Sequence, residues 1–105
     1  MILIQQDARQ WSTTDFPGVE NCQIWSGGEG DAGYLARFAA GASFPRHGHE
    51  GWEQIVILQG SIRFNEVELR VGDVLQVEAS DEHEAYAIEE TVLCVTRHGD
   101  IRFKE

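Results

Sequence analysis

The chain of 105 residues is long enough for one folded domain and too short for two that fold independently. Its apolar content of 42% argues against a disordered chain, and its formal charge of −10 excludes a cationic surface for nucleic acid or anionic membranes. The longest apolar run, IVIL at residues 55–58, is far too short to span a membrane. The N-terminus shows no basic segment followed by an apolar stretch, so no secretory signal is predicted and a cytoplasmic location is expected.

The first twenty residues, which include WSTTDFPG, are predicted to form an irregular arm that packs on the body of the domain or on a second subunit. A weak strand is expected in it at residues 2–5. Beyond the arm no window of helical length has a 3.6-residue apolar period, whereas short β-rich runs recur. Strands are predicted at residues 22–25, 34–39, 44–49, 53–59, 61–64, 67–70, 73–78, 83–88 and 92–97.

Turn-forming residues fill the gaps between these runs, for example GGEGDAG at residues 27–33 and QGS at 59–61. Eight or more short strands at close spacing predict an all-β domain, either a sandwich or a closed barrel. Closure would also remove sheet edges that a chain of this length has little material to cover. We therefore expect a single domain at residues 1–105, with the arm at 1–20 and the barrel at 21–105.

The two cysteines, Cys22 and Cys94, lie in the apolar runs NCQIW and VLCVT. We interpret them as small buried hydrophobic residues. A disulfide would require their strands to be neighbours, and a cytosolic chain disfavours one. Neither belongs to a CxxC pair, which excludes simple thiolate zinc modules and thioredoxin-like chemistry.

The stretch PRHGHEGWEQ at residues 45–54 holds two of the four histidines of the chain. Successive side chains of a strand alternate between faces, so His47 and His49 point the same way, with Cα atoms about 7 Å apart. Glu53 keeps this parity if the strand continues; if Gly51 bends the chain, Glu53 instead opens the next strand. His83, which opens the strand after the ASDE turn, is the candidate for a fourth ligand. The alternative is a solvated polar bend between two strands.

Three neutral imidazoles and one carboxylate suit divalent iron, manganese, nickel, cobalt, copper or zinc, and the set does not choose among them. A four-coordinate ion would be structural, whereas a five- or six-coordinate ion would keep positions for water or substrate. The sequence shows no second acid–base pair, no Ser/His/Asp order and no glycine-rich phosphate loop. Any chemistry would therefore have to be carried by the metal.

Four further residues near the motif are not expected to be ligands. His98 follows the last strand and is interpreted as a surface residue. Glu50 and Glu84 have the opposite parity to the ligand histidines and should face away from the metal. Trp52 should also point outward, against the arm or a dimer partner. Four aromatic residues could line a pocket: Tyr34, Phe38, Phe64 and Tyr86. For each of them, filling of the core is the simpler interpretation. Arg37 and Arg63 are expected on the outer face.

Residues 41–60 resemble the first motif of the cupin superfamily, G-x5-H-x-H-x3-E-x6-G. Every defined position matches: Gly41, His47, His49, Glu53 and Gly60. The stretches VENCQIWSGGEGDAGYLARF and ETVLCVTRHG, with the arm, look like the ChrR-type branch of this superfamily. That branch is named for an anti-sigma factor whose C-terminal half is such a cupin.

The second cupin motif, G-x5-P-x-G-x2-H-x3-N, is matched only by Gly72 and His83. Its Pro, Gly and Asn are replaced by Glu78, Ser80 and Ala87. This departure puts the shape of the turn at 78–82 in doubt, but not the placement of His83.

The resemblance implies an all-β cupin, a small antiparallel β-barrel or jelly roll of the double-stranded β-helix type. It implies one divalent ion, such as zinc, iron, manganese or nickel, held by His47, His49, Glu53 and His83, and a homodimer. Anti-sigma activity does not carry over, because the separate helical zinc domain that contacts the sigma factor has no counterpart in these residues.

Two functions stay open, and a third hypothesis is a β-barrel without a functional metal. One is a metal-dependent enzyme, of the oxygenase type, that acts on a small organic molecule. The other is a non-catalytic ChrR-type sensor or ligand-binding module. Cupins include enzymes and binding proteins alike, so the fold implies the site and not the reaction.

Overall fold

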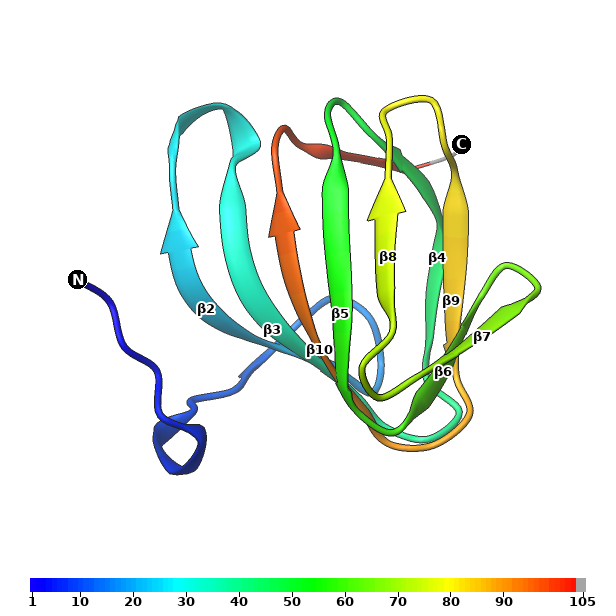
Figure 1. The fold of residues 1–105 in the computed structure, drawn as a ribbon, viewed down its shortest axis with the longest axis horizontal. Helices are drawn as coiled ribbons and strands as arrows, with labels where there is room; N and C mark the ends of the chain where they lie inside the picture. Colours follow the sequence, from blue (N-terminus) through cyan, green and yellow to red (C-terminus); the bar gives the residue numbers. More distant parts are fainter. Residues whose placement is uncertain (104–105) are drawn as a thin grey trace.

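The computed structural model describes residues 1–103, which form two antiparallel sheets that face each other (Figure 1). The six-stranded sheet has the order β1 (Ser12–Thr13), β2 (Val19–Ser26), β3 (Ala32–Phe38), β10 (Thr91–Arg97), β5 (Glu53–Gln59) and β8 (Val74–Val77). The five-stranded sheet has the order β11 (Ile101–Phe103), β4 (Ser43–His49), β9 (His83–Ala87), β6 (Ser61–Phe64) and β7 (Val67–Arg70). The remaining elements are two short 3-10 turns, η1 (Gln6–Ala8) and η2 (Gly28–Gly30).

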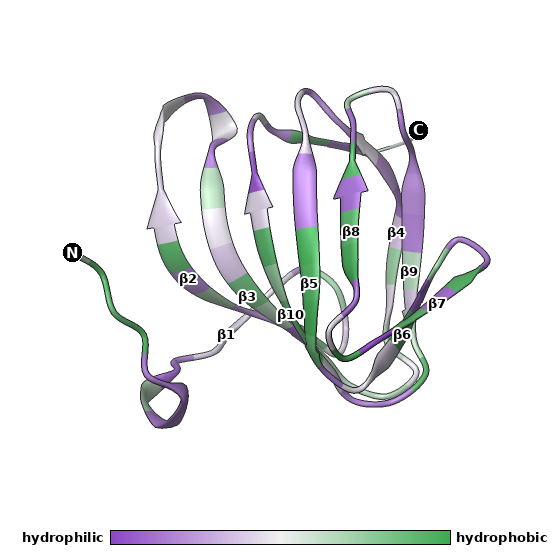
Figure 2. Cartoon of the chain, viewed as in Figure 1, coloured by the Kyte–Doolittle hydropathy of each residue, from purple (hydrophilic) through white to green (hydrophobic). Residues whose placement is uncertain are grey.

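The core lies between the two sheets and is built by alternating side chains. On β5 the side chains of Glu53, Ile55 and Ile57 are buried, whereas Gln54 is exposed, as the two-residue period of a strand requires. Ile57 packs with residues of both sheets, among them Ile62 and Leu93. Figure 2 shows that β5 and β10 are hydrophobic along their lower parts and hydrophilic at their upper ends. The buried histidines and Glu53 lie at the upper end of the sheets, whereas the buried hydroxyls of Ser61 and Thr91 hydrogen-bond at the other end.

The nine main strands predicted from sequence are all present, with bounds that differ by a few residues at most. Two short strands, β1 and β11, were not predicted. The weak strand expected at residues 2–5 is wrong, because this segment pairs with no other strand and leaves Met1 and Leu3 exposed. A strand is stable only where a neighbour satisfies its backbone groups. Farther along the arm, Phe16 packs on the core at 4.5 Å from Phe44 between ring centroids.

The prediction of an all-β jelly roll is confirmed. Of the two forms considered from the sequence, a sandwich and a closed barrel, the structure shows the sandwich. Among residues 1–103, the hydrogen bonds of the strands run within each sheet and do not join the sheets into a closed barrel. Strands β1 and β8 are the edges of one sheet, and β11 and β7 are those of the other. In the part of the chain that the structure describes, no helix is long and apolar enough to cross a membrane.

Both cysteines are unpaired. Cys22 on β2 is buried, Cys94 on β10 is half-buried, and each lies opposite Leu35 of the intervening strand β3. Two strand spacings put their Cα atoms about 10 Å apart, which is beyond the reach of a disulfide. The interpretation of both as packed hydrophobic residues is consistent with this placement.

We expect Gly60→Ala to lower the free energy of unfolding by about 3 kcal/mol or more. Gly60 turns the chain between β5 and β6 with φ +82°, and a Cβ there would overlap the carbonyl oxygen of Glu90. Gly72 is the matched control, because it also has a positive φ of +92° but nothing within 4 Å of an added Cβ. Gly72→Ala should cost about 1 kcal/mol, which reports the backbone conformation alone. Urea denaturation measures both, and equal costs would contradict the role given to the close approach at Glu90.

Candidate metal centre

Two of the predicted ligands come from the end of β4. His47 and His49 lie on the same face of this strand, and each is at most 4% exposed. The alternation predicted from sequence is thus present, and both imidazoles point into the space between the sheets. The alternative of a solvated polar bend is wrong for these two side chains.

Glu53 reaches the same space from the opposite sheet. Strand β4 ends at His49, the chain bends at residues 50–51, and Glu53 opens β5 with 3% of its surface exposed. Of the two routes considered from sequence, the bend at Gly51 is the one that the structure shows. A side chain at Gly51 would overlap the carbonyl oxygen of His98, so the bend needs glycine to pass this segment.

His83 supplies the fourth side chain from a strand more than thirty residues later. It opens β9, and in the antiparallel ladder of β4 and β9 it lies directly opposite His47. Residues opposite each other in such a ladder share a face, so His83 also points into the interior, where it is 4% exposed.

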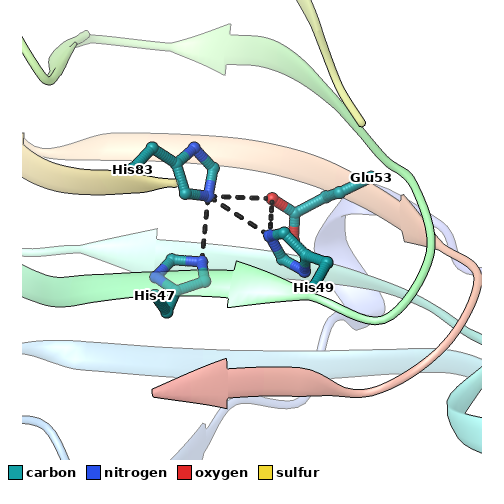
Figure 3. A group of neighbouring side chains, drawn as sticks. All are labelled: His47, His49, Glu53 and His83. Carbon is teal, nitrogen blue, oxygen red and sulfur yellow. Dashed lines mark hydrogen bonds and ion pairs between the residues drawn. The ribbon is translucent and has the colours of Figure 1, made fainter. Parts of the chain in front are cut away.

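The four side chains converge (Figure 3). Nε2 of His83 lies 2.9 Å from Nε2 of His47 and 3.4 Å from Nε2 of His49. Oε1 of Glu53 lies 3.2 Å from Nε2 of both His49 and His83. One ligand atom from each residue falls within 4.8 Å of all the others, so the cluster can hold a metal ion. Bonds of about 2.0–2.2 Å to one ion place neighbouring ligand atoms roughly 3.0–3.5 Å apart, which the measured separations fit.

The orientation of the rings also suits a metal. Nδ1 of His47 lies 2.9 Å from the carbonyl oxygen of Pro45, so it donates there and leaves Nε2 with a free lone pair. Nδ1 of His49 and of His83 is buried without a hydrogen-bond partner among residues 1–103. Every ring therefore turns its Nε2 toward the cluster. Phe44 packs edge-on against His47 and Phe64 stacks on His83, which holds both rings in place.

Two members of the cluster, His47 and Glu53, have protonation states that suit metal ligands. The pKa of His47 is lowered from 6.5 to about 4, mainly by burial and in smaller part by charge on neighbouring His83. Burial by itself raises the pKa of Glu53, but hydrogen bonds from His49 and His83 more than offset this and lower the pKa to about 2. Near neutral pH, His47 is neutral and Glu53 is ionised, which are the forms that bind metals.

A cavity of about 420 Å³ lies beside the cluster, and His47, Glu53 and His83 form part of its wall. Most of the remaining wall is apolar, including Phe38 and Phe64. A small molecule in this cavity would thus lie against three of the four ligand residues. The size is in the lower part of the range of small-molecule sites, about 300–1,000 Å³.

The four residues expected to lie outside the cluster do so. Glu50 pairs with Arg102 at 3.2 Å, and Glu84 lies 3.6 Å from Arg46, both on the surface. Trp52 is 39% exposed, and its ring stacks on exposed His98 rather than on the arm. Nδ1 of His98 donates to Oδ1 of Asp31 at 2.7 Å.

The aromatic candidates divide between the cavity and the surface. Tyr34, Phe38 and Phe64 line the cavity, whereas Tyr86 is 42% exposed beneath Arg63. Sequence reasoning missed Arg97, which also lines the cavity. The alternation that buries Leu93 and Val95 on β10 continues to Arg97 and was the available signal.

Comparisons with known proteins agree with this geometry. No curated protein matches the chain. Among solved structures, the complex of Rhodobacter sphaeroides SigE with the anti-sigma ChrR contains a similar chain, with TM-score 0.77 and 26% identity over 88% of this chain. That match covers 51% of the other chain, so the present chain spans about half its length.

Two further structures share the fold at lower identity. An RmlC-like cupin from Ralstonia eutropha has TM-score 0.85 and 20% identity, with 98% of this chain and 71% of that chain covered. An acetylacetone dioxygenase from Acinetobacter johnsonii has TM-score 0.85 and 15% identity, with 100% and 77% covered. The sequence model of the ChrR cupin-like domain matches residues 1–102. The chain therefore belongs to the ChrR cupin-like domain family, as the resemblance of its motifs implied.

Proposed function

We propose that the protein binds one divalent metal ion through His47, His49, Glu53 and His83 and acts as an enzyme on a small organic molecule, in a reaction of the oxygenase type. The observation that carries this proposal is the cavity of about 420 Å³ whose wall includes His47, Glu53 and His83. A purely structural metal site has no need of such a space beside its ligands. The similar fold of an acetylacetone dioxygenase supports the same class of reaction.

The side chains of the cluster suit this role. A divalent ion held by them would supply a Lewis acid to an oxygen donor of the bound molecule. The single carboxylate of Glu53 leaves a positive charge of about +1 on such a set, which attracts an anionic donor. The apolar wall that includes Phe38 and Phe64 excludes water from a bound molecule and strengthens polar interactions inside the cavity.

A second candidate is a non-catalytic ChrR-type module that binds a metal and senses a ligand. It is favoured by the match of the ChrR cupin-like model to residues 1–102 and by 26% identity to the chain in the SigE–ChrR complex. In this alternative the same cavity receives an effector that is not transformed.

Oxygen uptake separates the two candidates. The protein loaded with ferrous iron is supplied with a panel of 1,3-dicarbonyl and catechol-like compounds that includes carboxylic acids of both kinds, and oxygen consumption is recorded with an electrode. We expect uptake with at least one compound, none with the zinc-loaded protein, and none with His49→Ala. Absence of turnover with the panel and with iron, manganese and nickel would contradict the enzyme and leave the binding module.

A further inference from the structure

Arg97 lies beside the metal-ligand cluster, at the polar end of the cavity. On β10 it is directly opposite Glu53 of β5 and Ala32 of β3 in the antiparallel ladders. Residues so paired point to the same face of a sheet, so Arg97 shares the inner face with Glu53. It is half-buried and forms part of the cavity wall. A positive charge thus stands next to the place where a bound molecule would meet the cluster.

The guanidinium of Arg97 has few partners within the protein. Its Nε donates to the carbonyl oxygen of Gly30 at 3.3 Å, its Cζ lies 5.5 Å from the centroid of the Tyr34 ring, and it forms a side-chain hydrogen bond with Tyr34. No carboxylate oxygen of residues 1–103 lies within 4.0 Å of it. Four other arginines, by contrast, each have a carboxylate partner: Arg37, Arg46, Arg70 and Arg102. Within residues 1–103, Arg97 has no ion pair, as is also true of Arg9 and Arg63, and it is the arginine among these three that lines the cavity.

The two carboxylates that line the same cavity are already engaged elsewhere. Oδ1 of Asp31 lies 2.7 Å from Nδ1 of His98 and 3.1 Å from the backbone nitrogen of Gly99. Oε1 of Glu53 lies among the ligand histidines. Arg97 also forms a side-chain hydrogen bond with Tyr34, so the N–H groups that this bond and the Gly30 bond do not use are the ones that can face a molecule in the cavity.

The rest of the wall limits what that molecule can be. Beyond the polar end, the inner face of the six-stranded sheet presents Ile55, Leu93 and Val95 to the cavity. Tyr34 lies under Arg97, and burial raises its pKa to about 12, so its hydroxyl is protonated at neutral pH. An apolar chamber with an arginine and a phenol at one end suits a small molecule with an apolar body and one anionic group.

We propose that Arg97, with Tyr34 beside it, binds the carboxylate of the molecule that enters the cavity, so that the protein selects small aromatic or aliphatic organic acids. The planar guanidinium can donate two parallel hydrogen bonds to the two oxygens of a carboxylate. A neutral amide has one oxygen to accept such bonds and no negative charge, so it should bind more weakly. This inference adds the substrate class to the proposed function. It rests on that proposal only where it assumes that the bound acid also contacts the metal.

Calorimetric titration with two matched pairs of probes tests the proposal: benzoate against benzamide, and phenylacetate against phenylacetamide. We expect the wild-type protein, loaded with zinc, to bind each acid at least tenfold more tightly than its amide. Arg97→Gln should lose this preference while its affinity for the amides stays the same. Arg97→Lys keeps the charge and should retain part of the preference. Arg63→Gln, which changes an arginine on the outer face over Tyr86, is the matched control and should behave as wild type.

The same titrations on protein treated with a chelator separate this inference from the metal proposal. Because Arg97 is not a metal ligand, the preference for acids should persist without metal. If Arg97→Gln still prefers the acids, the preference comes from the metal and the inference is overturned. Equal affinity of wild type for acid and amide, or no binding of either acid at about 10 mM, would also overturn it. Protein that takes up no metal yet prefers acids through Arg97 would contradict only the proposed function.

Discussion

Replacing His49 with alanine is expected to abolish stoichiometric metal binding, whereas replacing His98 with alanine should leave it unchanged. His49 is buried, and its Nε2 lies 3.4 Å from Nε2 of His83 and 3.2 Å from Oε1 of Glu53. Its loss removes one ligand atom and leaves a buried space that a methyl group does not fill. Since changes to residues that merely support metal ligands cost about 10–100-fold in affinity, loss of a ligand should cost at least 100-fold.

Elemental analysis of the purified and dialysed proteins measures this effect, and competition with a chelator gives the change in affinity. His98→Ala is a suitable control because it also removes an imidazole, but from an exposed side chain that pairs with Asp31. Equal metal content in wild type and His49→Ala would contradict the assignment of the ligands.

Removal of the metal is expected to lower the free energy of unfolding by about 4 kcal/mol when the free ion is present at roughly 1,000 times its dissociation constant. In a domain of this size, such a change lowers the midpoint of thermal unfolding by about 15 °C or more. The structural reason is that the cluster joins the two sheets. Glu53 belongs to the six-stranded sheet and His47 and His83 to the five-stranded sheet, and no backbone ladder within residues 1–103 links the two. An ion bound by all of them would cross-link the sheets.

Calorimetry of the metal-replete and chelator-treated proteins measures this stabilisation. The matched variant is His49→Ala, whose unfolding temperature should not respond to added metal. If the wild type unfolds at the same temperature with and without metal, or if His49→Ala is stabilised as strongly, the stabilisation does not come from this cluster.

Local patterns carried most of the fold prediction. The alternation of apolar side chains and the turn residues between them located β5, β6 and β7 with their observed bounds. The same two-residue period placed His47 and His49 on one face, because parity along a strand depends on nothing beyond the strand. The segment at residues 2–5 shows the limit of such patterns. Its apolar residues favour a strand, but a strand also needs a second strand to pair with, and residues 2–5 pair with none.

The position of Glu53 shows a second limit. Its spacing from His49 fits both a continuous strand and a bend, and the two routes differ only in whether Gly51 passes close to another segment. That segment contains His98, which is far along the chain. The sequence around Gly51 therefore cannot predict the close approach.

His47, His49, Glu53 and His83 could be named as one set from the chain alone, because their spacing resembles a known motif and strand parity is local. The pairing of His83 with His47, the cavity beside them and the place of Arg97 in its wall required the tertiary structure. Pairing and cavities are set by strands distant in sequence, whose register depends on the packing of both sheets together. The residue types thus determine which side chains can hold an ion, and the packing of the two sheets determines what can lie beside it.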